Sequence, residues 1–316
     1  MIGSLSVGWL VVDSAAGHIT VMLASVVGMS FTWPTLEALV SEGEDYAGLQ
    51  RNVGLYNVVW AGTGALAYFS GGAMLDQLGL NSMFSVPLAI LCLQLALTFR
   101  LAGVAKNTGP DKARDAIPPG DQAAVSPPCP PEKARAFLRM AWLANPFSYI
   151  AINTLVAVMP GVALRLGLST TLAGVCCSVW CFARLAAFFG LWFWPGWHYR
   201  FRWLLAAYLA LIVTFTVIVI VPNLAVVVLA QLALGGALGL IYYSSLFYSM
   251  DVGDTKGVHG GIHEAAIGLG SFAGPAVGAA ALYFMPQFAN GGALAVSVLL
   301  LGGLGGLLGI WRATKT

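Results

Sequence analysis

Long apolar runs separated by short polar breaks dominate the chain. Nine of these runs are long enough to cross a bilayer as helices, because a span needs ~20 apolar residues. Helix is the expected structure, because lipid contains no water to form hydrogen bonds with unpaired backbone N–H and C=O groups. The pattern predicts an all-α membrane protein with nine full transmembrane helices and one short N-terminal helix. The nine runs cover residues 18–41, 53–75, 82–103, 137–163, 171–194, 203–222, 224–250, 258–284 and 289–310, and the short run covers residues 3–12.

One segment departs from this pattern. Residues 104–136 hold seven prolines and nine charged residues, a composition that cannot pack a core. We therefore predict three parts: an N-terminal helical bundle over 1–103, a cytoplasmic linker over 104–136, and a C-terminal six-helix bundle over 137–316.

Composition excludes a water-soluble enzyme and a disordered chain. Hydrophobic residues make up 59% of the 316 residues and charged residues only 9%, whereas a soluble domain carries ~25% charged residues. The net charge of +2 gives no electrostatic basis for binding nucleic acid. No P-loop motif is present and the five cysteines lack zinc-site spacing, so we predict no cofactor.

Basic residues predict the orientation of the chain. If residues 104–136 face the cytoplasm, alternation of the spans places 13 of the 15 lysine and arginine residues on that side. We therefore expect a multi-pass protein of the cell membrane, the inner or plasma membrane, with both termini in the cytoplasm.

The two hydrophobic blocks carry similar patterns. At an offset of 207 residues, Gly28 falls on Gly235 and Gly54 falls on Gly261. In both copies an acidic loop separates two glycine-containing spans. Parallel repeats of this kind are typical of transporters.

The chain resembles the major facilitator superfamily. Gly28–Ala38 is similar to the fourth helix of that family, Arg51–Asp76 to its fifth helix, and the proline-rich segment to its central cytoplasmic loop. Gly190–Arg202 resembles a degenerate copy of its glycine–acid–basic loop, without the acidic residue. The resemblance implies a two-bundle helical fold and a secondary transporter of a small organic solute that works by alternating access.

The repeat also predicts that the first bundle is incomplete. The same offset leaves about 70 residues of that bundle without a counterpart, equal to the first two family helices. A fragment, a misplaced start codon and a true short form are all compatible with this deficit. A non-transporting remnant or a sensor on a transporter scaffold is therefore an alternative function, ahead of a membrane-embedded enzyme.

Charged side chains inside spans are expensive and are functional candidates. At 1.5 Å per residue, Glu264 and Arg184 lie ~10 Å and ~15 Å below the same membrane surface, so they are able to pair. Such a pair would open and close during transport, or Glu264 would bind a proton. The alternatives are a permanent structural pair or a Glu264 that caps its own helix. Glu37, close to Glu42 and Glu44, is expected at a hydrated helix end.

His259 and His263 have the four-residue spacing of metal ligands on a helix. Neighbouring glycines disfavour a firm helix there, so we predict no metal site. His263 stays a candidate for proton transfer because imidazole titrates near neutral pH.

Polar and aromatic side chains within the spans are candidates for lining a solute path. They suit a sugar-like, nucleoside-like or amphipathic organic solute. The structural alternative for each is anchoring at the membrane surface or tying helices together. These candidates are Tyr56, Asn57, Trp60, Tyr149, Asn153, Trp180, Gln231, Tyr242 and Tyr243.

These features together predict a monomeric transporter rather than an enzyme. Its partners are a small organic solute and the lipid bilayer. The candidates for the transport or charge site are Glu264, Arg184, His263, Asn57 and Glu37. Protons are a further partner if Glu264, His263 or Glu37 takes part in coupling, and uncoupled facilitated diffusion stays open.

Overall fold

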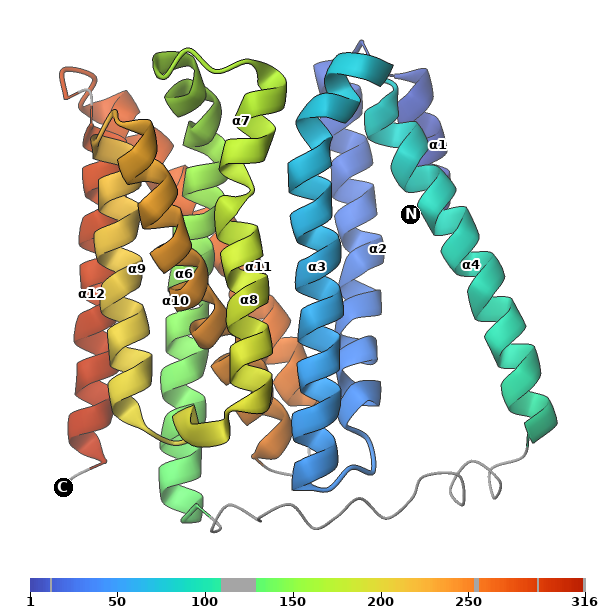
Figure 1. The fold of residues 1–316 in the computed structure, drawn as a ribbon, viewed down its shortest axis with the longest axis vertical. Helices are drawn as coiled ribbons and strands as arrows, with labels where there is room; N and C mark the ends of the chain where they lie inside the picture. Colours follow the sequence, from blue (N-terminus) through green and yellow to red (C-terminus); the bar gives the residue numbers. More distant parts are fainter. Residues whose placement is uncertain (12, 109–128, 253–255, 289, 315–316) are drawn as a thin grey trace. The chain divides into compact units, whose positions relative to one another are not determined.

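The computed structural model describes residues 1–11, 13–108, 129–252, 256–288 and 290–314, and all regular structure among them is helical (Figure 1). The polypeptide passes through long helices joined by short turns. In chain order the helices are α1 (Ile2–Leu10), α2 (Ala15–Ser41), α3 (Tyr46–Leu78), α4 (Ser82–Thr108), α6 (Pro131–Arg165), α7 (Thr170–Cys177), α8 (Val179–Phe193), the short 3-10 helix η1 (Pro195–Trp197), α9 (Phe201–Ile220), α10 (Leu224–Asp251), α11 (Lys256–Phe284) and α12 (Gly291–Ala313).

Nine helical segments of the described chain are long and apolar enough to cross a membrane, which confirms the predicted pattern. The short N-terminal helix is α1. The run predicted at 171–194 is one candidate span made of two helices, α7 and α8. They meet at Ser178, whose hydroxyl donates to the carbonyl of Val175 over 2.7 Å.

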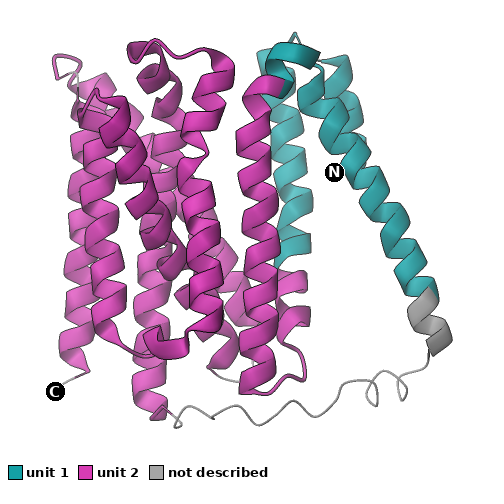
Figure 2. Cartoon of the chain, in the orientation of Figure 1, with its two compact units in different colours: residues 1–33, 74–126 teal, residues 34–73, 127–316 magenta. Residues whose placement is uncertain are grey.

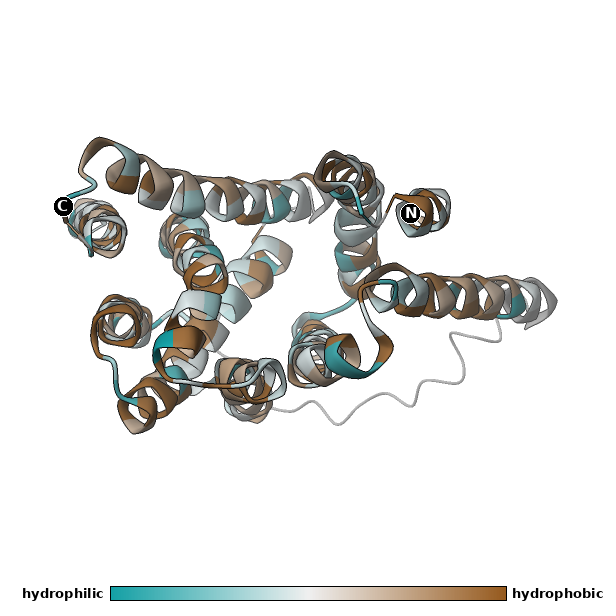
Figure 3. Cartoon of the chain, turned by 90° about the horizontal axis from the view of Figure 1, so that it is seen from above, coloured by the Kyte–Doolittle hydropathy of each residue, from teal (hydrophilic) through white to brown (hydrophobic). Residues whose placement is uncertain are grey.

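The outer faces of the spans are apolar. Large side chains such as Phe99 (70% exposed), Phe272 (74%) and Val298 (66%) point away from the protein interior. Brown hydrophobic positions run along the helices in Figure 3. Exposure of such large apolar surfaces to water is unfavourable, whereas their contact with lipid chains is not. The protein is therefore membrane-embedded.

The chain forms two compact units, residues 1–33 with 74–126 and residues 34–73 with 127–316 (Figure 2). In the first unit α1 packs on α4, where a Cβ on Gly8 would lie 2.4 Å from the ring of Phe84. Most of the predicted linker, residues 109–128, lies outside the described residues. Its two ends are helical, because α4 continues to Thr108 and α6 begins at Pro131.

In the second unit, glycines allow the central helices to cross at close range. A Cβ on Gly270 of α11 would lie 2.2 Å from the carbonyl oxygen of Pro146 on α6. A Cβ on Gly235 of α10 would lie 2.4 Å from the carbonyl oxygen of Trp180 on α8. Small residues permit such contacts between membrane helices. The same contacts hold α8, α10 and α11 in place around the site described below.

The turn between α8 and α9 is tied to neighbouring helices by polar side chains. His198 is buried against Phe247, with ring centroids 4.2 Å apart, and its Nδ1 shares a hydrogen bond of 2.5 Å with the Tyr46 hydroxyl. Burial lowers the pKa of His198 to about 3. The hydroxyl group of Tyr199 donates a hydrogen bond to the carboxylate of Asp251. Burial and this hydrogen bond raise the pKa of Tyr199.

Candidate functional site

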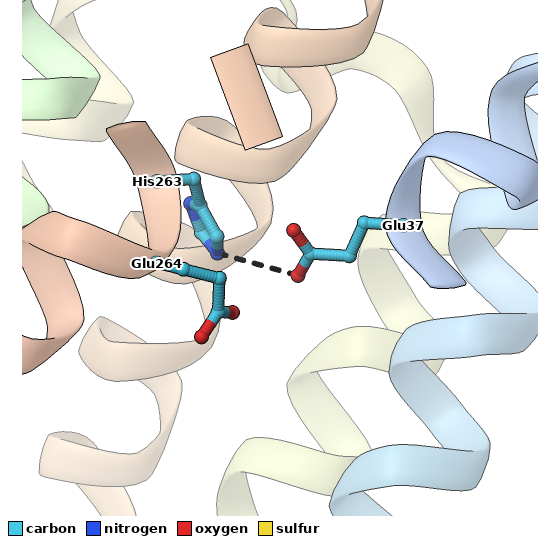
Figure 4. Close-up of side chains that lie close together, drawn as sticks. All are labelled: Glu37, His263 and Glu264. Atoms are coloured by element: carbon cyan, nitrogen blue, oxygen red, sulfur yellow. Dashed lines mark ion pairs between the residues drawn. The ribbon is translucent and has the colours of Figure 1, made fainter. Parts of the chain in front are cut away.

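Two carboxylates and a histidine meet inside the second unit. Glu37 comes from the last part of α2, and His263 and Glu264 are consecutive residues of α11. One ligand atom from each lies within 4.8 Å of the others, and Figure 4 shows the three side chains converging. His263 Nε2 lies 3.8 Å from Glu37 Oε1. We call these three residues the carboxylate–histidine cluster.

The prediction that Glu37 lies at a hydrated helix end is wrong. Its side chain is only 1% exposed, and Tyr56 donates a hydrogen bond to its Oε1 over 3.4 Å. The cover comes partly from α11, where a Cβ on Gly260 would lie 3.6 Å from Glu37 Oε2 and 3.8 Å from the carbonyl oxygen of Pro34. The α11 backbone at Gly260 thus lies beside the carboxylate.

Two neighbours set the orientation of the His263 ring. Its Nδ1 lies 2.8 Å from Ser245 Oγ and 3.4 Å from Asn145 Nδ2. These contacts occupy Nδ1 and leave Nε2 as the ring nitrogen that faces Glu37. Ser245 and Asn145 were not predicted, although Asn145 was visible as an amide inside an apolar run.

The charge of the cluster is unbalanced. Glu37 Oε2 and His263 Nε2 have no hydrogen-bond partner among the described residues. Two carboxylates at this spacing repel each other in a medium of low polarity, so the site favours a bound proton or cation between them. Carboxylate and imidazole groups are also ordinary ligands of divalent transition metals. The cluster can therefore bind a proton, and its three donors can also hold a metal ion.

The expectation that glycines prevent a firm helix around His259 and His263 is wrong. The helix is continuous from Lys256 to Phe284 through its glycines, because packing against neighbouring helices supports it. As a result Glu264 lies well inside the helix and does not cap its start. His259 does not join His263 in a ligand set, since its Nδ1 faces the carbonyl oxygen of Ser249 over 3.0 Å.

Arg184 does not pair with Glu264. Its guanidinium carbon lies 4.5 Å from the ring centre of Trp60 and 4.9 Å from that of Trp180. α8 directs the side chain toward α3, where a Cβ on Gly64 would lie 3.9 Å from Arg184 Nη2, an ordinary van der Waals contact. Cation–π contacts of this kind partly replace water around a buried cation.

A stack of rings connects Arg184 to the carboxylate–histidine cluster. Trp60 lies parallel to Tyr242, with centroids 4.7 Å apart and planes 8° apart. Tyr242 meets His263 edge-on at 4.9 Å. The order Arg184, Trp60, Tyr242, His263 is thus continuous through contacts between neighbouring side chains.

A cavity of about 460 Å³ lies beyond Trp180. Its wall is mostly aliphatic and comes from α3, α6, α7, α8, α9 and α10. Two of the predicted lining residues, Trp180 and Gln231, contribute to it. The amide of Gln231 is buried and makes no hydrogen bond among the described residues. Tyr68 and Cys177 also line the cavity and were missed, because an apolar run does not show which face looks inward.

The other predicted lining residues have different surroundings. Asn153 ties α6 to α11, because its Nδ2 donates to Ser271 Oγ over 3.0 Å. Asn57 is fully buried, with both amide atoms unpartnered among the described residues. Tyr149 and Tyr243 are also buried, and their hydroxyl groups have no hydrogen-bond partner among the described residues. Asn153 thus fits its structural alternative, and the other three carry unused polar groups.

Comparisons with known proteins add no assignment. No family model matches the chain, and no curated protein sequence matches it. The site itself is therefore the basis for the proposed function.

Proposed function

We propose that the protein is a secondary transporter that moves a small organic solute by alternating access, coupled to protons. The observation that carries this proposal is the carboxylate–histidine cluster between two apolar helices, in which Glu37 and His263 are buried and Glu264 is half-buried, without a compensating cation among the described residues. Ionisable groups at such positions are expensive and mark ion pathways in membrane proteins.

The origin of the two carboxylates supports coupling to a conformational change. Glu37 belongs to the predicted bundle 1–103, and Glu264 belongs to the predicted bundle 137–316. A proton held between them favours their contact, whereas loss of that proton leaves two charges that repel. Rocking of one bundle against the other would therefore alternate between a protonated, closed contact and an open one.

The proposed architecture follows the same logic. We assign the chain to a two-bundle fold like that of the major facilitator superfamily, with both termini cytoplasmic in the cell membrane. The internal repeat at an offset of 207 residues and the distribution of lysine and arginine support this assignment.

The test is a flux assay in proteoliposomes. Proton-driven currents are recorded for a fixed panel of carboxylates, sugars, amino acids and nucleosides. We expect at least one class to give a protein-dependent current, and Glu37→Gln and Glu264→Gln each to reduce it at least tenfold. Glu42→Gln is the matched control, because Glu42 is exposed just beyond the end of α2. Absence of flux for the whole panel, or wild-type pH dependence in both variants, would refute the proposal.

A further inference from the structure

Arg184 is a buried cation without an anion. Its side chain is 6% exposed, and no carboxylate of the described chain forms an ion pair with it. Its Nε has no hydrogen-bond partner there either. Cation–π contacts with two tryptophan rings offset part of the desolvation cost of this cation. A guanidinium group in an apolar surrounding still favours a negative partner.

The α3 helix runs from this cation to the wall of the cavity, which Arg184 itself does not line. Trp60, Gly64, Tyr68 and Gly72 follow each other at four-residue spacing, so they share one face of the helix. Arg184 lies against Trp60 and reaches Gly64, while Tyr68 and Gly72 line the cavity one and two turns further on. Trp180 belongs to both places, since it contacts Arg184 and lines the cavity.

The cavity wall suits an apolar body with one polar end. Aliphatic side chains of α6, among them Leu155, Met159 and Leu164, make up one side. The unpartnered amide of Gln231 supplies a hydrogen-bonding group inside it. A volume of about 460 Å³ falls within the range of small-molecule sites.

We propose that this cavity binds a small organic monoanion with an apolar body, a carboxylate, whose charged group pairs with Arg184. The inference rests on the proposed transport function and names its solute class, but the binding test below needs no transport. The planar guanidinium group matches the two oxygens of a carboxylate. A single arginine balances one negative charge, so a monoanion would compensate the buried charge of Arg184 without an excess.

The experiment uses Cys177, which lines the cavity, as a local reporter. In a variant with Cys92, Cys129 and Cys176 replaced by serine and Cys181 by alanine, the rate of labelling by N-ethylmaleimide reports occupancy. The probes are benzoate and 4-phenylbutyrate, each compared with its uncharged amide. Calorimetric titration of the purified full chain in nanodiscs gives the corresponding affinities.

We expect the carboxylates to slow labelling at least fivefold and to bind at least tenfold more tightly than the amides. Arg184→Gln should remove this preference, Arg184→Lys should retain part of it, and the exposed control Arg202→Gln should leave it unchanged. Because Arg184 has no anion in the described chain, Arg184→Gln should not lower the melting temperature. This stability readout separates loss of binding from misfolding.

Equal binding of acid and amide, no protection by either carboxylate, or an unchanged preference in Arg184→Gln would each overturn the proposal. Protection without any flux in proteoliposomes would contradict transport while leaving the anion site intact. Flux of uncharged solutes alone would support transport while contradicting the anion site.

Discussion

The indole ring of Trp60 lies flat on the ring of Tyr242, with centroids 4.7 Å apart and planes 8° apart. Trp60 also carries the guanidinium group of Arg184 on its face, and Tyr242 contacts His263. A displacement of either ring therefore reaches both the unpaired cation and the carboxylate–histidine cluster. This pair is the physical link between the two proposed sites.

The first prediction concerns this ring pair. Tyr242→Leu removes the stacked ring while the cluster and Arg184 stay in place. An aromatic pair contributes roughly 0.5–1.5 kcal/mol beyond its buried area. We expect proton-driven uptake to fall about threefold to tenfold in Tyr242→Leu, measured in proteoliposomes across pH 5–8. Tyr242→Phe keeps the ring and should retain uptake. Equal loss in both variants would assign the effect to the hydroxyl group instead of the stack.

The nine spans could be predicted because each one is a long apolar run, and lipid permits only helix there. The unusual positions of Arg184 and Glu264 were also visible, since a charge in an apolar run stands out. Their partners were not. A helix that is apolar on all sides gives no periodic signal, so the sequence does not show which neighbour each side chain meets.

The burial of Glu37 likewise could not be predicted from the sequence. The residue lies four positions before the end of α2, and a helix end is usually wet. Part of its cover comes from α11 at Gly260, more than two hundred residues later in the chain. Only the tertiary structure reveals that α11 is continuous there and packs beside this carboxylate.

The second prediction tests the close crossing of α6 and α11. Gly270→Ala places a Cβ 2.2 Å from the carbonyl oxygen of Pro146 and 2.7 Å from the Cβ of Tyr149, so a helix must shift. Overpacking of this kind costs about 1–3 kcal/mol. We expect a lower melting temperature in detergent for Gly270→Ala. Gly268→Ala is the matched control, because its Cβ would meet nothing within 4 Å. Equal melting temperatures for the two variants would contradict the crossing.

The third prediction concerns acid stability. The pKa of His198 is lowered from the 6.5 of an exposed imidazole to about 3 in the folded protein, because the ring is buried. Below pH 6.5 the unfolded chain therefore binds a proton that the folded chain does not. The stability contributed by neutral His198 is fully present above pH 6.5 and is lost progressively as the pH falls toward 3. The slope is at most about 1.4 kcal/mol per pH unit.

His198→Asn removes this titration and keeps a side-chain oxygen that can accept from Tyr46. We expect the melting temperature of the wild type to fall more steeply than that of His198→Asn between pH 6.5 and pH 5. An equal change of melting temperature with pH in the two proteins would contradict the prediction. It would show that burial of His198 does not oppose its protonation in the folded protein. The comparison between the two proteins cancels the titration of other groups.

The fourth prediction uses Zn²⁺ as a competitor for the proposed proton site. Zn²⁺ binds imidazole nitrogen and carboxylate oxygen at about 2.0–2.2 Å, and one such atom from each of Glu37, His263 and Glu264 lies within 4.8 Å of the others. Small side-chain movements would bring all three onto the ion. We expect micromolar Zn²⁺ to inhibit proton-driven uptake, and Mg²⁺ to have no such effect because it prefers six oxygen ligands and keeps its water. His263→Ala should weaken inhibition at least tenfold, whereas His259→Ala, whose ring faces Ser249, should not. If Zn²⁺ inhibits both variants equally, it acts elsewhere, and the three side chains do not form one binding site.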